Sequence, residues 1–281
     1  MSAYTTYMNR LDTKKRAQIL GMLVEGMSLR ATSRLADVSI NTVTKLLVDL
    51  GKACSDYQDR NLRNLPCKRV QVDEIWAFCY AKRTNVAKAK AAPEGAGDVW
   101  TWTSLCADTK LVPSWRVGTR DTVEGKIFIQ DLADRLSSRI QLTSDGLKAY
   151  IHAVEDAFGT DVDYAQLHKI YGPAAATPGR YSPSVCLGTK SARVVGKPDP
   201  KHVNTSFVER QNLTMRMSMR RFTRLTNAFS KKIENHAHAV AIHFMWYNFG
   251  RIHKSLRVTP AMEAGVSEHV WTLEEVVGLI E

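Results

Sequence analysis

Residues 68–80 read KRVQVDEIWAFCY and are rich in β-branched and aromatic side chains, a composition that predicts a long β-strand. Two further strands are predicted at 98–107 and 111–117, and the short turn 108–110 joins them as a hairpin. Residues 83–97 contain proline and glycine and are expected to form a loop between the first two strands. The region is therefore expected to open with three antiparallel strands.

The elements that follow alternate between helices and strands. Residues 121–138 carry apolar side chains at near-helical spacing and predict an amphipathic helix. Later elements are expected at 140–144 (strand), 147–158 (helix), 162–170 (strand), 204–224 (helix) and 228–249 (helix). Residues 172–203 are rich in proline, glycine and serine and are expected to form a long loop. The order βββαβαβα is that of a ribonuclease-H-like domain. Residues 67–250 are therefore expected to form an α/β (α+β) fold with a mixed five-stranded sheet and flanking helices.

Three helices are predicted before this region, between residues 13 and 57. The stretch 31–47, ATSRLADVSINTVTKLL, has the spacing of a helix-turn-helix, whose last helix enters the DNA major groove by its N-terminal end. Ser28 is expected to cap the middle helix, and Ser39 or Asn41 the last one. The inward-facing side chains of the middle helix are expected to be Leu29, Ala31, Thr32 and Leu35. A plain three-helix bundle is the alternative.

Residues 58–66, QDRNLRNLP, are polar and end in proline, as suits a linker. The chain is accordingly divided into a small all-α helix-turn-helix DNA-binding domain with its linker (1–66), the ribonuclease-H-like domain (67–250) and a C-terminal tail with a short helix (251–281).

The charge of the chain favours nucleic acid as a partner. The net charge is +11 and the pI about 9.5, although many unrelated proteins are basic. Residues 201–232 contain eight lysines and arginines against Glu209 alone, or 8 − 1 = +7. The side chains expected to contact double-stranded DNA are Arg30, Arg34, Ile40, Asn41, Thr42, Thr44 and Lys45 of the helix-turn-helix, and Arg210, Arg216, Arg220, Arg221, Arg224, Lys231 and Lys232 of the basic segment.

Cysteine spacing and hydropathy exclude other classes of function. The five cysteines include no C-x-x-C pair, so neither a zinc site nor a redox dithiol is expected. No run approaches the ~20 apolar residues that span a bilayer, and the N-terminus lacks the apolar core of a signal peptide. A cytoplasmic protein without a membrane partner is expected.

Three acids stand where a carboxylate is costly unless it is used. Asp73 lies in the middle of the first strand, Asp145 closes the strand 140–144, and Glu209 lies on a helix between apolar residues. A single acid of this kind is usually structural, but the expected fold brings these three positions together. Glu74 is expected to point to the opposite face of the strand from Asp73 and so not to be a ligand.

Carboxylate oxygens are the ligands that Mg²⁺ prefers, and they leave water positions open. Two such ions about 3.5–4 Å apart can activate a water or a 3′-hydroxyl and stabilise the leaving oxygen. Asp73, Asp145 and Glu209 are therefore the candidate catalytic residues and metal ligands.

Three blocks of sequence resemble transposases of the insertion-sequence-one type, within the DDE superfamily. They are VDEIWAFCYAK (72–82), TSDGLKAY (143–150) and the long block 206–249 that begins SFVERQNLTMRM. The resemblance covers roughly residues 68–260 and implies a ribonuclease-H-like fold, Mg²⁺ dependence, and catalysis by Asp73, Asp145 and Glu209. Members of this group often carry an N-terminal zinc-binding cysteine motif, which this sequence lacks.

The activity expected from the resemblance is cleavage at transposon ends followed by attack of the freed 3′-hydroxyl on target DNA. Two Mg²⁺ ions are expected in the active site, with Mn²⁺ able to substitute. The expected partners are terminal inverted repeats, target DNA and a second copy of the chain, as a homodimer or higher oligomer. Two alternatives stay open: a catalytically silent DNA-binding regulator, and a nuclease of the same fold that only hydrolyses.

Overall fold

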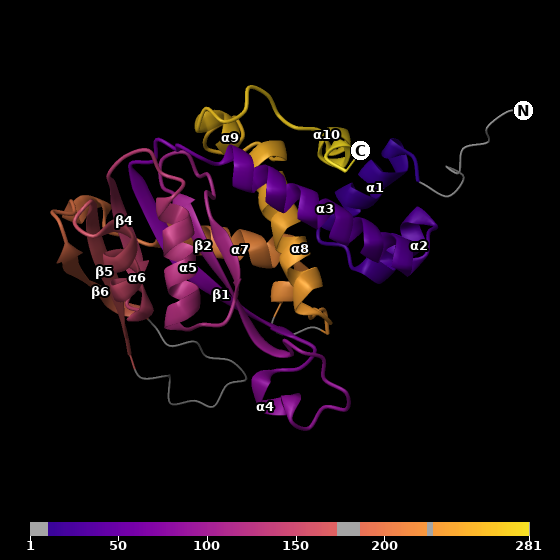
Figure 1. Cartoon of the computed structure of the whole chain (residues 1–281), viewed down its shortest axis with the longest axis horizontal. Helices are drawn as coiled ribbons and strands as arrows, with labels where there is room; N and C mark the ends of the chain where they lie inside the picture. The colour runs from indigo at the N-terminus through magenta and orange to yellow at the C-terminus, as the bar shows by residue number, and fades with distance from the viewer. Residues whose placement is uncertain (1–10, 173–185, 224–226, 281) are drawn as a thin grey trace, which may run out of the picture.

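The computed structural model describes residues 11–172, 186–223 and 227–280 (Figure 1). Its centre is a six-stranded sheet in the order β3-β2-β1-β4-β5-β6. The strands are β1 (Arg69–Cys79), β2 (Gly97–Cys106), β3 (Trp115–Gly118), β4 (Ile140–Asp145), β5 (Val162–Tyr171) and β6 (Cys186–Val195). The first three strands are antiparallel neighbours, β4 runs parallel to β1, and β5 runs parallel to β4. This arrangement confirms the mixed α/β, ribonuclease-H-like fold.

The sixth strand was not expected. β6 pairs antiparallel with β5 inside the region for which the sequence predicts a long loop. Most of its residues are exposed, because β6 is an edge strand with little packed against it. A strand that is wet on both faces has no apolar alternation, and the sequence therefore gave no signal for it.

The third strand begins later than predicted. Leu111 and Val112 are fully buried but are not part of β3. The backbone of Val112 instead bonds to the side chain of Asn248, which accepts from the amide and donates to the carbonyl, both at 3.0 Å. This pairing satisfies the polar backbone groups without a neighbouring strand. In the predicted loop 83–97, the structure adds the short helix α4 (Arg83–Val86).

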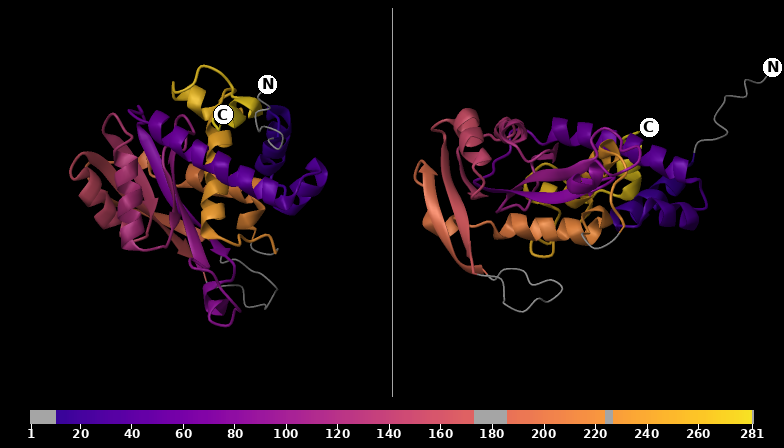
Figure 2. Two further views of the ribbon diagram at one scale, coloured as in Figure 1. Left: turned by 45° about the vertical axis from the view of Figure 1, so that its right-hand side comes forward. Right: turned by 90° about the horizontal axis from the view of Figure 1, so that it is seen from below.

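Helices cover both faces of the sheet (Figures 1 and 2). The helices after β3 are α5 (Thr122–Ala133), α6 (Ala149–Phe158), α7 (Ser206–Ser218), α8 (Ile233–Met245), α9 (Pro260–Glu263) and α10 (Leu273–Gly278). On the α5 and α6 face, Trp102 packs edge-on against Tyr150 at 5.5 Å between ring centroids. On the α7 and α8 face, a second core cluster joins Ile75 to Val208 and Phe244.

The single helix predicted for 204–224 is interrupted. α7 ends at Ser218, Met219 has extended backbone angles, and a 3-10 turn follows at Arg220–Phe222. Met219 and Phe222 are both buried in the α7 and α8 cluster, and the chain leaves the helix where they turn inward. Arg220 and Arg221 are therefore not on the helix of Glu209. A five-residue π-helix, Trp246–Gly250, continues α8, and the turn Pro200–His202 precedes α7.

The N-terminal helices are α1 (Thr13–Val24), α2 (Leu29–Ala36) and α3 (Ile40–Asn61). The hydroxyls of Ser28 and Ser39 cap α2 and α3 by accepting bonds from backbone amides three residues on, both at 3.1 Å. Leu35 is 59% exposed, so its expected inward orientation was wrong. Thr32 and Ala36, four residues apart, form the buried side of α2, and Leu35 lies outside that stripe.

The stretch 58–66 is packed rather than extended as a free linker. α3 continues to Asn61, and Gln58, Leu62 and Leu65 are buried. Their spacing of four and three residues is helical, and it is obscured in the sequence by the charged residues between them. The Gln58 side-chain amide donates to the carbonyl of Ala241 in α8 (3.1 Å).

α3 and α8 pack closely along their length. A Cβ atom at Gly51 of α3 would lie 2.4 Å from the Cβ of His238 in α8, so only glycine allows this approach. At the other end of the chain, residues 251–280 contain both α9 and α10, and α10 packs against α1. Among the described helices, none combines the length and the apolar character that crossing a bilayer requires.

Candidate active site

A cavity of about 850 Å³ lies where β1, β4, β5 and α7 meet. Among the described residues, four carboxylates and four cationic side chains line it, so it suits both metal ions and phosphate groups. The acids are Asp73, Glu74, Asp145 and Glu209, and the cations are Arg120, Lys148, Lys169 and Arg216.

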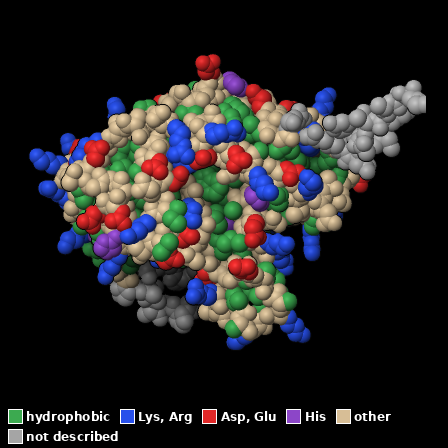
Figure 3. Space-filling model, in the orientation of Figure 1, with side chains coloured by type: hydrophobic (Ala, Val, Ile, Leu, Met, Phe, Trp, Pro, Cys, Tyr) green, Lys and Arg blue, Asp and Glu red, His purple; other side chains and the backbone are tan. Residues whose placement is uncertain are grey.

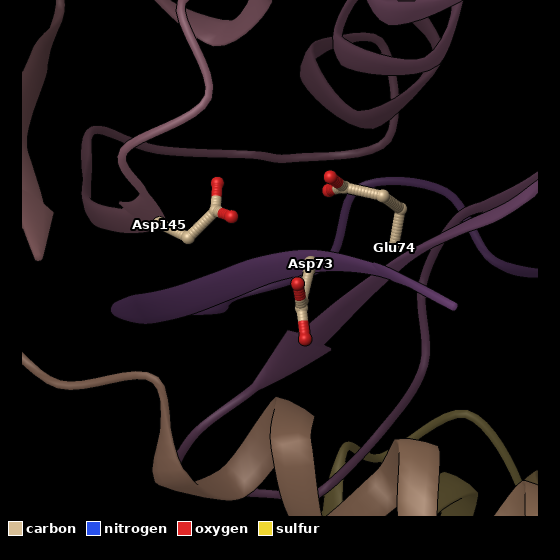
Figure 4. A group of neighbouring side chains, drawn as sticks. All are labelled: Asp73, Glu74 and Asp145. Atoms are coloured by element: carbon tan, nitrogen blue, oxygen red, sulfur yellow. The ribbon is translucent and has the colours of Figure 1, made fainter. Parts of the chain in front are cut away.

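Asp73 enters the cavity from the middle of β1. Its side chain points toward α7 (Figure 4), where the amide of Asn212 donates to Asp73 Oδ2 at 2.8 Å. Burial raises the pKa of Asp73 to about 7, and the nearby carboxylates of Glu74 and Asp145 raise it further. The site therefore holds more negative charge than its protein neighbours neutralise.

Asp145 is the last residue of β4, and the strand end turns it toward Asp73 and Glu74. Its Oδ1 accepts a hydrogen bond from the backbone amide of Leu147 at 3.0 Å. Gly146 follows because a Cβ there would lie 2.5 Å from Nδ1 of His168, another residue of the cavity wall.

Glu209 reaches the same cavity from the first turn of α7. One of its oxygens accepts from the hydroxyl of Thr205, and the other lies 2.6 Å from Nζ of Lys169 on β5. Lys169 is thus an internal counter-ion for the acid.

Glu74 belongs to the cluster, contrary to the expectation from strand alternation. It does leave β1 on the opposite side from Asp73 (Figure 4), yet one oxygen of each of Asp73, Glu74 and Asp145 lies within 4.8 Å of the others. β1 pairs with β4 only over Arg69–Gln71. Beyond Gln71 the strands are no longer paired, and Asp145 can lie beside both faces of β1.

The carboxylate of Glu74 is held by two donors. Arg120 donates from Nε (2.6 Å) to Oε1, and the hydroxyl of Tyr150 donates to Oε2 (2.9 Å). The side chain of Glu74 is only 1% exposed, and burial raises its pKa. Sequence reasoning missed this group because Arg120 and Tyr150 lie 46 and 76 residues away along the chain.

These oxygens fit a divalent cation. Their hard donor set and their excess negative charge are what Mg²⁺ or Mn²⁺ would neutralise. Asp73 and Asp145 would hold such an ion together, with Glu74 and Glu209 as the further oxygen donors that line the cavity.

The structure separates the expected DNA contacts into surface and packed groups. At the outer end of the three N-terminal helices, Arg30, Arg34, Ile40, Asn41 and Lys45 are exposed. Thr42 bonds to the Ser39 hydroxyl and Thr44 to the Ile40 carbonyl, so both have structural contacts.

In the basic segment, Arg210, Arg220, Lys231 and Lys232 are exposed, and Arg216 lines the cavity. Arg221 is half-buried, and its Nη1 donates to the hydroxyl of Ser230 at 2.9 Å. Burial also lowers its pKa. Arg224 lies outside the described residues.

No family model and no curated protein matches this chain. Three solved structures are similar to it at low identity. A pre-cleavage Mos1 transpososome has 12% identity over 55% of this chain and 59% of that chain, with a TM-score of 0.21. The Mos1 mariner paired-end complex with Mn has 13% identity over 52% and 58%, with a TM-score of 0.21. A piggyBac transposase synaptic complex with hairpin DNA has 10% identity over 95% and 69%, with a TM-score of 0.38.

The chain therefore spans less than three fifths of the length of the two Mos1 chains, at 59% and 58%. The fold is identified by the strand order and strand directions described above.

Replacing Lys169 with Gln is expected to tighten the binding of Mn²⁺ to the protein without DNA. The change removes the cation that competes for Glu209, and because both side chains are about a third exposed the gain is modest, about two- to fivefold in Kd. Calorimetric titration measures it. Lys126→Gln, which breaks a surface pair with Asp156 outside the cavity, is the control and should leave the Kd unchanged.

Proposed function

We propose that this chain is a DNA transposase that cuts DNA at transposon ends and joins the freed 3′-hydroxyl to target DNA in a metal-dependent reaction. The observation that carries the proposal is the meeting of acids from β1, β4 and α7 in one cavity whose rim is cationic. Acids alone would suit any cation site. The four cations beside them provide for the phosphodiester that such chemistry needs.

Each group of the cavity has a separate role in this proposal. Asp73 and Asp145 fix the position of the divalent ions, for which Mg²⁺ is proposed with Mn²⁺ as a substitute. When bound, two such ions supply Lewis-acid activation of the attacking and leaving oxygens. Arg216 and Lys148 line the cavity from opposite elements and would hold the phosphate in place. Glu209 is released to the site when Lys169 moves from its carboxylate to the DNA.

A strand-transfer assay tests this function. Full-length protein is incubated with Mg²⁺, labelled DNA carrying the ends of its own element, and a plasmid target. Joined products support the proposal. Cleaved ends without joints would indicate a nuclease that only hydrolyses, and binding without cleavage would indicate a silent regulator.

The basic segment is proposed to follow the DNA backbone, and adjacent arginines provide a matched test. Each phosphate that is neutralised contributes about 0.9 to the salt dependence of duplex binding. Arg220 is exposed, whereas Arg221 is half-buried and bonded to Ser230. Arg220→Gln should therefore flatten the slope by about 0.9, and Arg221→Gln should leave it unchanged. Titrations at four salt concentrations measure both, and equal slopes in the two variants would contradict the assignment.

The N-terminal end of α3 is proposed to read the transposon end. Deleting residues 1–66 cannot test this, because α3 is packed into the core along α8. Asn41→Ala removes an exposed amide at the start of α3 and should lower the preference for specific over random duplex about tenfold, since one base contact is worth about 1–3 kcal/mol. Competition binding measures the ratio, and random-sequence affinity is the internal control.

A further inference from the structure

β1 and β2 extend beyond the rest of the sheet as a two-stranded arm. They stay paired from Val70–Cys106 to Cys79–Gly97. β4 accompanies β1 only over Arg69–Gln71, and β3 accompanies β2 only over Trp100–Thr103. The outer half of the hairpin, residues 76–100, is therefore paired only within itself along most of its length. It projects from the sheet with α4 near its tip (Figure 1).

One face of this arm is packed and the other is aromatic. Ile75 and Ala77 are buried in the α7 and α8 cluster. Trp76 and Phe78 alternate with them and lie on the opposite face, with Trp100 directly across from Trp76 in the strand register.

A fourth ring completes the aromatic face. Phe229 stacks on Phe78 at 5.0 Å between ring centroids. We call the half-buried rings Trp76, Phe78, Trp100 and Phe229 the aromatic track.

A cation lies over three of these rings. Nζ of Lys82 is 5.9 Å from the Trp76 ring, the guanidinium of Arg120 is 4.8 Å from Trp100, and Nζ of Lys231 is 5.1 Å from Phe229. Lys82 and Lys231 are exposed.

The arm as a whole is basic. Residues 82–93 add four lysines and arginines and no acid. Asp98, across from Phe78, accepts a hydrogen bond from the backbone amide of Arg83 and so is turned to α4. Figure 3 shows hydrophobic side chains bordered by lysine and arginine on this projecting part.

The aromatic track begins at the cavity. Glu74 is the preceding residue on the same face of β1, and Arg120 binds Glu74 while stacking on Trp100. At a rise of about 3.3 Å per residue, Glu74 to Phe78 covers about 13 Å. A strand leaving the acids would therefore meet Trp76 and Trp100 first.

We propose that the aromatic track binds unpaired nucleotides of the DNA strand that is cut in the cavity. The rings would stack on the bases and the cations would contact the phosphates. The inference rests on the proposed function only for the source of that strand. Duplex DNA fits less well, because its bases are stacked on one another and closed to an outside ring. Aromatic rings interleaved with cations are how proteins bind single strands of any sequence, since every base has a π-face.

Binding of a 12-nucleotide single strand containing 2-aminopurine tests the proposal with full-length protein. Trp76→Leu keeps an apolar side chain but removes the ring, and Trp76→Phe keeps a ring. We expect Trp76→Leu to weaken single-strand binding about tenfold and to abolish the quenching of 2-aminopurine, whereas Trp76→Phe retains most of both. Duplex affinity of both variants should stay within about twofold of wild type.

Phe207→Ala is the matched control, because Phe207 is 39% exposed, lies under Lys110 at 3.8 Å and does not line the cavity. Melting curves confirm that each variant is folded. Equal losses for single strand and duplex, or an equal loss in Phe207→Ala, would overturn the proposal. So would a change in sedimentation without a change in binding, which would make the track a contact between two copies of the chain.

The two proposals fail separately. Wild-type protein that joins strands while Trp76→Leu binds single strands normally sinks only the aromatic track. Protein that never cuts but loses single-strand binding in Trp76→Leu sinks only the transposase function.

Discussion

Asp73→Asn is expected to abolish DNA cleavage in Mg²⁺, with a loss of at least about a thousandfold, while duplex binding survives. The amide matches the carboxylate in shape and keeps a partner for Asn212, but it removes the charge that neutralises a divalent ion. Losing about 4 kcal/mol of stabilisation of the reacting oxygens corresponds to that factor. Gel assays of nicked product measure cleavage, and fluorescence anisotropy measures binding.

The same result is expected for Asp145→Asn and Glu209→Gln, since both side chains line the cavity. Glu155→Gln on the exposed side of α6 is the matched control and should cleave normally. Full cleavage by any one of the three variants would remove that acid from the site. Mn²⁺ titration provides a second readout, because each change should weaken ion binding even when no DNA is present.

Arg120→Ala is expected to lower the free energy of unfolding by about 2–3 kcal/mol at pH 8. It breaks an ion pair whose acid, Glu74, is only 1% exposed, and a buried charge left without its partner is costly. The value is at the lower end of the usual range because Arg120 itself is 38% exposed. Urea denaturation at pH 5, 7 and 8 measures it.

The loss should shrink at low pH, and the sign follows from Glu74. Burial already raises its pKa above 4.5 in the folded chain, and losing Arg120 removes a cation that lowers it. As the pH rises above 4.5, the unfolded chain releases this proton while the folded chain holds it, so stability falls with rising pH. Arg116→Ala, which breaks a pair with the more exposed Glu124, should cost about 1 kcal/mol or less. A pH-independent loss in Arg120→Ala would show that packing on Trp100 is what matters.

The parts of the fold that sequence predicts are those whose apolar period is regular. Residues 68–80 alternate along a half-buried strand, and β1 occupies Arg69–Cys79. The caps Ser28 and Ser39 were predictable because a hydroxyl before a helix satisfies amides that have no other partner. Asp73 and Asp145 could be selected because each interrupts or ends such a run.

The features that escaped prediction depend on contacts between distant residues. β6 is visible only through its pairing with β5. The role of Glu74 depends on where β1 and β4 part, which no local pattern encodes. Leu62 and Leu65 looked like part of a polar segment because their burial comes from packing against the rest of the fold. In each case the missing information is tertiary rather than local.

The unbroken course of α3 has a consequence for the length of DNA between a recognised sequence and a cut. Its 22 residues, at about 1.5 Å each, make a rigid rod of about 33 Å, close to the ~34 Å of one turn of the double helix. One end carries the side chains placed to read bases, and the other is fixed beside α8 through Gln58 and Gly51. Such a rod acts as a ruler. Binding and cutting would then be separated by a set number of base pairs, and the ends of the element would be defined by their spacing as much as by their sequence.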